Sequence, residues 1–351
     1  MQVTQEALPT VIDSVDQLDE VLTRPSPALC EMITTLASPL VILGAGGKMG
    51  PSLAVLAKRA AQAAGHSLDV IAVSRFRNPD ARQWLEQRNV KVVQNDVFDA
   101  AQLAQLPDAS NVIYLVGMKF GTTSDPVPTW ITNTLGPIQA SQRYPGSRIV
   151  ALSTGNVYPL VDLARRGSVE SDPLTPIGEY PNAAVARERI FQHYASSAGS
   201  LSPTTLIRLN YAHDLRYGVI SDIAGKISQH QPIDVSMPAF NAIWQGDANE
   251  LILRAFGLCS TPASILNVTG PTRERVGDIA SRLAQALDCD LRLVGEEQAT
   301  VLLSDSRKMV ERLGEPRVSI DQLVHWIAHW TKIGGLTYGK PTHFESRDGN
   351  F

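Results

Sequence analysis

The stretch Leu40-Val-Ile-Leu-Gly44-Ala-Gly-Gly47-Lys-Met-Gly50 decides the fold of this chain. Its first four residues are apolar without polar alternation, which is typical of a parallel strand buried on both faces. Apolar residues recur at helical spacing after Gly50, so a strand, a turn and a helix are predicted. The glycines suit a tight turn, a close approach of the backbone to a pyrophosphate, and helix packing, in that order. The stretch therefore predicts a phosphate-binding turn at a helix N-terminus.

Composition narrows the class of protein. The chain has 351 residues, 44% hydrophobic and 19% charged, which suits a globular protein of about two lobes. Its net charge of −4 comes from interspersed acidic and basic residues. Such a surface has no basic field for nucleic acid or an anionic membrane, so we expect neither as a partner. A small-molecule substrate is expected instead.

Cysteine usage and hydropathy indicate the compartment. Cys30, Cys259 and Cys289 are too few and too scattered for a disulfide framework or a zinc site. The N-terminus lacks a signal pattern, and no run approaches the ~20 apolar residues that a membrane helix needs. We therefore expect a cytoplasmic protein.

Two histidines near the C-terminus are a candidate metal site. His325 and His329 lie at helical spacing but lack a third ligand, so we predict that they pack a terminal helix and bind no metal.

The order of elements predicts an α/β architecture. Strand patterns near 39–44, 69–74, 91–94, 111–116, 148–153 and 204–208 alternate with helical patterns near 49–64, 79–88, 128–142 and 182–196. Such alternation predicts a Rossmann-like, doubly wound parallel sheet with a smaller C-terminal substrate lobe. We expect a helical N-terminal appendage over 1–37, which covers a domain edge or makes a subunit contact. A dinucleotide-binding domain is expected over 38–208, a substrate lobe over 209–335 with some chain returning to the main domain, and a tail over 336–351.

Ligands of such sheets bind at the carboxyl ends of the strands. The second strand ends in Ser74 and Arg75 without an acidic residue, which favours the 2′-phosphate of NADP over the free hydroxyl of NAD. A solvated surface arginine is the alternative, and Arg77 is a second candidate. Asp96, followed by Val97, ends the third strand and can accept a hydrogen bond from an adenine amino group.

The next strand ends carry the candidate chemistry. Leu115, Val116 and Gly117 place small and apolar residues under a bound cofactor, with Lys119 close by. The fifth strand ends in hydroxyl groups, including Thr154. A helical pattern that begins about 25 residues later puts the phenol of Tyr180 where it can face Thr154.

Together these motifs resemble the extended short-chain dehydrogenase/reductases, the group of NAD-dependent epimerase/dehydratases, over about 39–335. Further matches are Asn133-Thr-Leu-Gly136 and Arg208-Leu-Asn210. The resemblance implies that Thr154 binds the substrate hydroxyl, that Tyr180 is the acid/base for hydride transfer, and that the protein forms a homodimer. It places the cofactor, NADP with NAD as the alternative, against Gly44, Gly47, Lys48, Met49, Gly50, Ser74, Arg75, Asp96, Val97, Leu115, Val116, Gly117, Lys119, Asn133, Tyr180 and Leu209.

One position departs from the family pattern. Ala184 stands where Tyr-x-x-x-Lys has the lysine that lowers the pKa of the phenol and holds the ribose. Another cation can substitute: Lys119 and the oxidised nicotinamide both favour phenolate. Arg187 is a poorer substitute, because it lies roughly 10 Å along the helix from Tyr180 unless its side chain folds back. Alternatively, Tyr180 acts only as an acid, or the protein binds cofactor without turnover.

The substrate lobe offers weaker signals. Asn210, Arg216, Asn241 and Trp244 fall where this lobe should face the crevice, as do His213 and Gln245. Arg216 suggests an anionic substrate group, although an interlobe ion pair with Asp214 or Asp247 is as well supported. We therefore predict an NAD(P)-dependent oxidoreductase or epimerase acting on a hydroxyl or carbonyl of a sugar, sugar acid or nucleotide sugar. A non-catalytic, NADP-binding regulatory or scaffold protein is the alternative.

Overall fold

A seven-stranded parallel sheet forms the centre of the computed structural model, which describes residues 7–119, 125–196 and 200–349. The strand order is β12-β7-β5-β4-β1-β2-β3, so the order reverses between β1 and β4. Such a reversal opens a crevice at the carboxyl ends of the strands. The strands are β1 (Leu40–Leu43), β2 (Val70–Ser74), β3 (Lys91–Gln94), β4 (Asn111–Tyr114), β5 (Arg148–Thr154), β7 (Thr204–Leu209) and β12 (Ser264–Val268). The predicted Rossmann-like sheet is confirmed.

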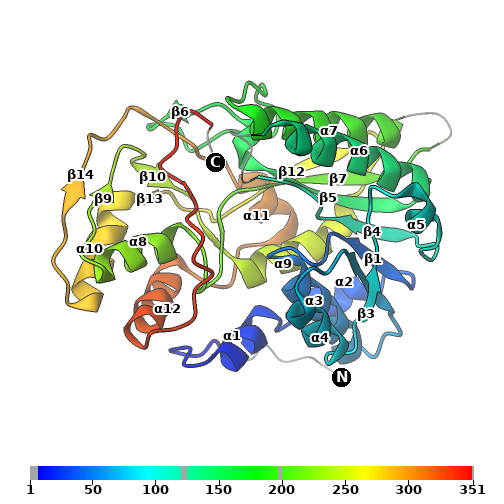
Figure 1. Cartoon of the computed structure of the whole chain (residues 1–351), viewed down its shortest axis with the longest axis horizontal. Helices are drawn as coiled ribbons and strands as arrows, with labels where there is room; N and C mark the ends of the chain where they lie inside the picture. The colour runs from blue at the N-terminus through cyan, green and yellow to red at the C-terminus, as the bar shows by residue number, and fades with distance from the viewer. Residues whose placement is uncertain (1–6, 120–124, 197–199, 350–351) are drawn as a thin grey trace.

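Both faces of the sheet are covered by helices (Figure 1). Leu40 and Ile42 of β1 enter one core and Val41 and Leu43 the other, which explains the unbroken apolar run. The first face is covered by α2 (Pro27–Ile33), α3 (Gly50–Ala63), α4 (Pro79–Glu86), α9 (Gln245–Arg254), η2 (Ala255–Leu258) and α11 (Arg307–Leu313). The opposite face carries α5 (Ala100–Ala104), α6 (Val127–Arg143) and α7 (Glu179–Ser196).

A second hydrophobic core belongs to the smaller lobe, whose largest buried side chains are Trp244 and Trp326. Its helices are α8 (Val219–Ser228), α10 (Val276–Leu287) and α12 (Ile320–Lys332). Short ladders pair β8 (Ala212–His213) with β11 (Ile243–Trp244), β9 (Ile233–Asp234) with β14 (Leu293–Val294), β10 (Ala239–Phe240) with β13 (Glu274–Arg275), and β6 (Val161–Asp162) with β15 (Thr300–Val301). The segment 209–335 also returns to the sheet, through α9 and the edge strand β12.

The N-terminal appendage contacts both lobes. Ser14 caps α1 (Val15–Leu22) by accepting a hydrogen bond from the amide of Gln17 at 3.2 Å. The apolar face of α1 joins the core of the second lobe, whereas α2 joins the core of the sheet. Asp19 of α1 accepts hydrogen bonds from Trp84 at 2.9 Å and from Arg216 at 3.2 Å. The appendage therefore links the two lobes within one chain.

The C-terminal tail runs between α12 and the region of β6 (Figure 1). The amide and hydroxyl of Thr342 both donate to Asp222, and Phe344 is buried with Phe240 in the second core. On α12, His329 pairs with Asp13 at 2.6 Å, while His325 is exposed. No group of metal-ligating side chains, and no helix long and apolar enough to cross a membrane, occurs among the described residues.

Candidate active site

Three glycines of the turn after β1, at positions 44, 47 and 50, lie in three different environments. Gly44 has φ +85°, and a Cβ on it would lie 2.9 Å from Val116. A Cβ on Gly50 would lie 2.4 Å from the carbonyl oxygen of Ala45, so the helix α3 packs against the turn only with glycine there. A Cβ on Gly47 would meet only the carbonyl oxygen of Gly44, at 3.5 Å. The backbone at Gly47 is therefore open to a ligand, at the start of α3, where helix amides favour an anion.

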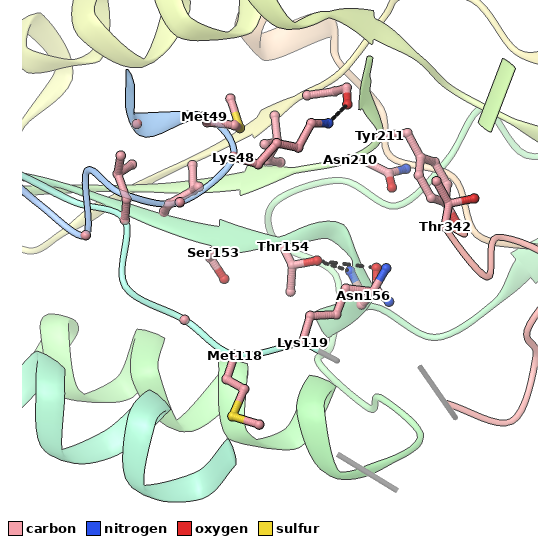
Figure 2. Close-up of a pocket in the computed structure, with 18 of the residues that line it drawn as sticks. Lys48, Met49, Met118, Lys119, Ser153, Thr154, Asn156, Asn210, Tyr211 and Thr342 are labelled. Carbon is pink, nitrogen blue, oxygen red and sulfur yellow. Dashed lines mark hydrogen bonds between the residues drawn. The ribbon is translucent and has the colours of Figure 1, made fainter. Parts of the chain in front are cut away.

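A pocket of about 320 Å³ opens beside this turn at the carboxyl ends of β1, β4, β5 and β7 (Figure 2). It brings together many of the predicted site residues, namely Gly44, Gly47, Lys48, Met49, Gly50, Leu115, Gly117, Lys119, Thr154, Tyr180, Leu209 and Asn210. These residues follow different strands along the chain, and parallel strands present their carboxyl ends at one edge of the sheet. Their roles as cofactor, catalytic or substrate residues stay predictions.

Some predicted cofactor residues lie outside the lining of this pocket. Arg75 lies 3.9 Å from the carboxylate of Asp96, and both side chains are partly exposed. Ser74 lies under the turn, where a Cβ on Gly46 would come within 2.7 Å of its hydroxyl. Val97 and Asn133 also lie outside the lining, and both are buried. Val116 contacts the turn at Gly44 and contributes its carbonyl rather than its side chain to the site, as described below.

Three of the predicted substrate residues lie outside the lining of this pocket. Trp244 is 1% exposed and packs against Trp326 at 5.3 Å between ring centroids. Asn241 is buried and bonded to the amide of Ser304 and the carbonyl of Thr272. Arg216 forms ion pairs with Asp214 and Asp19. Polar or aromatic character suggested a ligand contact for these residues, but partners inside the protein satisfy them. Gln245 is likewise buried, donating to Ser52.

Thr154 and Tyr180 meet in the pocket from β5 and α7. The Thr154 hydroxyl donates to the amide oxygen of Asn156 at 3.3 Å and accepts from its backbone amide at 3.2 Å. Because the first bond is long, the hydroxyl can turn to donate to a ligand instead. Asn210 contributes a buried amide nitrogen that has no hydrogen-bond partner in the described parts of the chain. The pocket therefore offers a hydroxyl, a phenol and an amide donor within one cavity.

A buried polar network supports this wall of the pocket. Ser153 donates to Glu188 at 2.6 Å, and Glu188 pairs with Arg208 at 2.7 Å. Arg208 also donates to the hydroxyl of Tyr158, which donates to Asn267. The network joins β5, α7, β7 and β12, so it orients the strand ends next to Thr154.

Two lysines enter the pocket. The ammonium of Lys48 donates to the carbonyl of Ala212 at 2.9 Å and lies 4.0 Å from the ring centroid of Tyr217. Residue 48 as a whole is exposed, but its ammonium faces these groups, and the loss of water lowers its pKa to about 7. Burial lowers the pKa of Lys119 to about 8, an effect that nearby Asp222 opposes. At pH 7 most of Lys119 is therefore protonated.

The second lobe and the tail close the pocket with residues that the sequence did not reveal. Tyr211 has φ +44°, an uncommon conformation for a tyrosine, and lines the pocket with Thr342 (Figure 2). Tyr217 lines the same pocket. His213 has both ring nitrogens engaged, by the carbonyl of Tyr211 and the amide of Ile220. No motif marks Tyr211, Tyr217 or Thr342, because long-range packing brings them to the site.

The geometry defines a Rossmann-like α/β protein with a second lobe over the carboxyl edge of its sheet. The model of the NAD dependent epimerase/dehydratase family matches residues 40–236, more than half of the chain. The chain belongs to this family. No protein with curated annotation matches the sequence significantly.

Solved structures of similar fold span nearly the whole chain. MoeE5, in complex with UDP-glucose and NAD, is 17% identical, with a TM-score of 0.67, and the match covers 85% of this chain and 99% of that one. A UDP-galactose 4-epimerase is 22% identical over 83% and 97%, with a TM-score of 0.64. The dTDP-glucose 4,6-dehydratase of Bacillus anthracis, in complex with NAD, is 14% identical over 84% and 97%, with a TM-score of 0.69. At these identities the likeness concerns the fold.

Proposed function

We propose that the protein is an NAD(P)-dependent oxidoreductase or epimerase that acts on a hydroxyl or carbonyl of a sugar, sugar acid or nucleotide sugar. The observation that carries the proposal is the meeting of an open glycine turn, Thr154 and Tyr180 in one pocket. Family membership and the ligands of the similar structures, NAD with UDP-glucose or UDP-glucuronic acid, support it.

In this proposal Tyr180 exchanges a proton with the substrate hydroxyl, while the Thr154 hydroxyl donates to the same substrate oxygen. The unpartnered amide of Asn210 donates to a second oxygen of the substrate. Lys119 supplies positive charge that favours the phenolate form of Tyr180. The dinucleotide, when bound, would accept a hydride from the substrate carbon and, in an epimerase, would return it to the substrate.

Cofactor titration and turnover test the proposal. Calorimetry on the purified protein should detect binding of NAD or NADP, and a turnover assay should use UDP-glucose, UDP-glucuronic acid and dTDP-glucose as probes. Tyr180→Phe should lower kcat by ~10²- to 10⁴-fold, as expected for loss of a general acid/base. Lys119→Met should also lower kcat. Absence of dinucleotide binding at millimolar concentration would overturn the proposal.

For cofactor choice, we propose a preference for NADP, supported by Ser74 and Arg75 at the end of β2 and by the absence of an acidic residue there. Arg75→Ala should weaken NADP binding and leave NAD binding unchanged. Equal affinity of the parent protein for NAD and NADP would show that Arg75 does not select NADP.

A non-catalytic, cofactor-binding role is the second candidate, and Ala184 in place of the family lysine favours it. In that case the protein binds dinucleotide, but neither Tyr180→Phe nor Lys119→Met changes turnover of any probe. Detectable turnover that falls in Tyr180→Phe excludes this candidate.

We also propose a homodimer that uses α6. Val127 and Ile131 of this helix are 64% and 49% exposed, which is unusual for neighbouring apolar side chains on a helix. Ile131→Glu should convert the dimer to a monomer, measured by light scattering after size-exclusion chromatography.

A further inference from the structure

Residue 184 does not line the pocket, although a cation that holds the cofactor would have to. Ala184 is fully buried in a small apolar cluster with Val157 and Tyr158. This cluster holds α7 against the end of β5, so the side chain at 184 serves packing here. Whatever holds the cofactor in place of the family lysine must come from another position.

Arg187, one turn further along α7, is a buried cation that lines the pocket. The residue is 4% exposed, and its Nη1 donates to the carbonyl of Val116 at 3.1 Å. Among the described residues, its Nε is buried without a hydrogen-bond partner and its guanidinium forms no ion pair with a carboxylate. A buried guanidinium is costly unless it is paired, because burial removes its hydration. Because Arg187 lines the pocket, acceptor atoms of a ligand bound there can offset this cost.

The loop after β4 is shaped to admit this side chain. A Cβ on Gly117 would lie only 2.6 Å from Nη1 of Arg187, so glycine leaves the space that the guanidinium occupies. Side chains of a helix lean toward its N-terminus, and this direction brings Arg187 back toward the end of the helix that carries Tyr180. Arg187 consequently lines the pocket together with Tyr180 despite its distance along the helix, which is the case that the sequence allowed for a side chain that folds back.

We propose that Arg187 binds oxygen atoms of the ribose-diphosphate backbone of the dinucleotide, and so takes over the holding role of the absent lysine. The proposal rests on the proposed function, in which this pocket binds NAD(P). In the family pattern one lysine both holds the ribose and lowers the pKa of the tyrosine. Here Arg187 would position the cofactor, and Lys119 would supply positive charge near Tyr180. Arg187 is a positioning residue that does not exchange the proton.

Fluorescence titration of the full-length protein with NADH tests the proposal. Arg187→Met should weaken NADH binding by ~10- to 100-fold, the range expected for loss of hydrogen bonds from a charged group. Arg187→Lys, which keeps the charge, should recover part of this loss. Arg189→Met is the matched control on the same helix: Arg189 is exposed and, within the described part of the chain, donates to Gln192, so its replacement should leave NADH binding unchanged.

Two ligand fragments separate the possible acceptor atoms. If Arg187 binds the diphosphate, Arg187→Met weakens ADP as well as ADP-ribose. If it binds hydroxyls of the second ribose, only ADP-ribose and NADH are weakened. Either result supports the proposal, whereas unchanged affinity for both NADH and ADP-ribose overturns it.

Thermal melts without ligand separate this role from a structural one. Arg187→Met removes a buried charge without an acidic partner, so its melting temperature should equal or exceed that of the parent, while the shift produced by NADH shrinks. A lower melting temperature together with an unchanged NADH-induced shift would show a structural role and overturn the proposal. If the parent protein itself binds neither NADH nor ADP-ribose, the proposed function fails instead.

Discussion

The ammonium of Lys48 donates a hydrogen bond to the carbonyl of Ala212, 2.9 Å away, and thereby joins the glycine turn of the sheet to the second lobe. The same ammonium lies over the ring of Tyr217. A lysine in the turn thus contacts the wall on the opposite side of the pocket. Because Lys48 lies in the glycine turn and lines the pocket, a charged ligand there can change its protonation.

Dinucleotide binding should take up a proton through Lys48. Its pKa is lowered to about 7 in the protein alone, so at pH 8 the amine is mostly neutral. An anionic diphosphate nearby favours the ammonium and raises this pKa, and affinity should therefore fall as pH rises above about 7. Calorimetry at pH 8 in two buffers of different ionisation enthalpy measures the uptake. Lys48→Met should abolish it, and equal uptake in parent and variant would contradict the prediction.

The buried pair of Glu188 and Arg208 should be costly to break. Both side chains are at most 2% exposed, so Arg208→Met leaves Glu188 as an uncompensated buried charge. We expect a loss of about 3–5 kcal/mol in the free energy of unfolding, measured by urea denaturation. Arg82→Met breaks an exposed pair with Glu86 and should cost at most about 1 kcal/mol. Similar losses in the two variants would show that burial of the pair does not matter.

His213 should make the fold sensitive to acid. Burial lowers its pKa to about 3, whereas an unfolded histidine titrates near ~6.5. Between these values the unfolded chain binds a proton that the folded protein does not, so stability falls as pH falls below about 6.5. The contribution approaches about 1.4 kcal/mol per pH unit. His213→Gln should flatten the dependence of unfolding free energy on pH in this window. His325→Gln, at an exposed position, is the control, and should leave it unchanged.

Asp19 should couple the two lobes through the N-terminal helix. Its carboxylate accepts from Trp84 of α4 and from Arg216 of the second lobe. Asp19→Ala should lower the free energy of unfolding by about 1–3 kcal/mol, because it leaves two partly buried donors without this acceptor. Asp16→Ala on the exposed side of the same helix should change it by less than about 0.5 kcal/mol. Urea denaturation followed by tryptophan fluorescence compares them, and equal effects would refute the linking role of Asp19.

Interactions between residues close along the chain determine the central strand, the glycine turn and the first sheet helix, so the sequence alone predicts them. The apolar run from Leu40 and the glycines at 44, 47 and 50 specify a strand, a turn and a helix through contacts that are close along the chain. Because parallel strands end at one edge, knowledge of the strands alone places Thr154, Lys119 and Leu209 around a common crevice. Tyr180 could be found in the same way, from the helix that follows the fifth strand.

Three features depend on the tertiary structure alone: the Arg187 side chain lines the pocket, Trp244 is buried, and Thr342 of the C-terminal tail lies at the pocket. Each depends on a partner distant in sequence: Gly117 for Arg187, Trp326 for Trp244, and Asp222 for Thr342. Residue type and spacing describe what a side chain can do but not which distant group it meets. That choice is made when the two lobes pack, since burial pairs each polar group with a partner or, as for the Nε of Arg187, leaves it without one among the described residues.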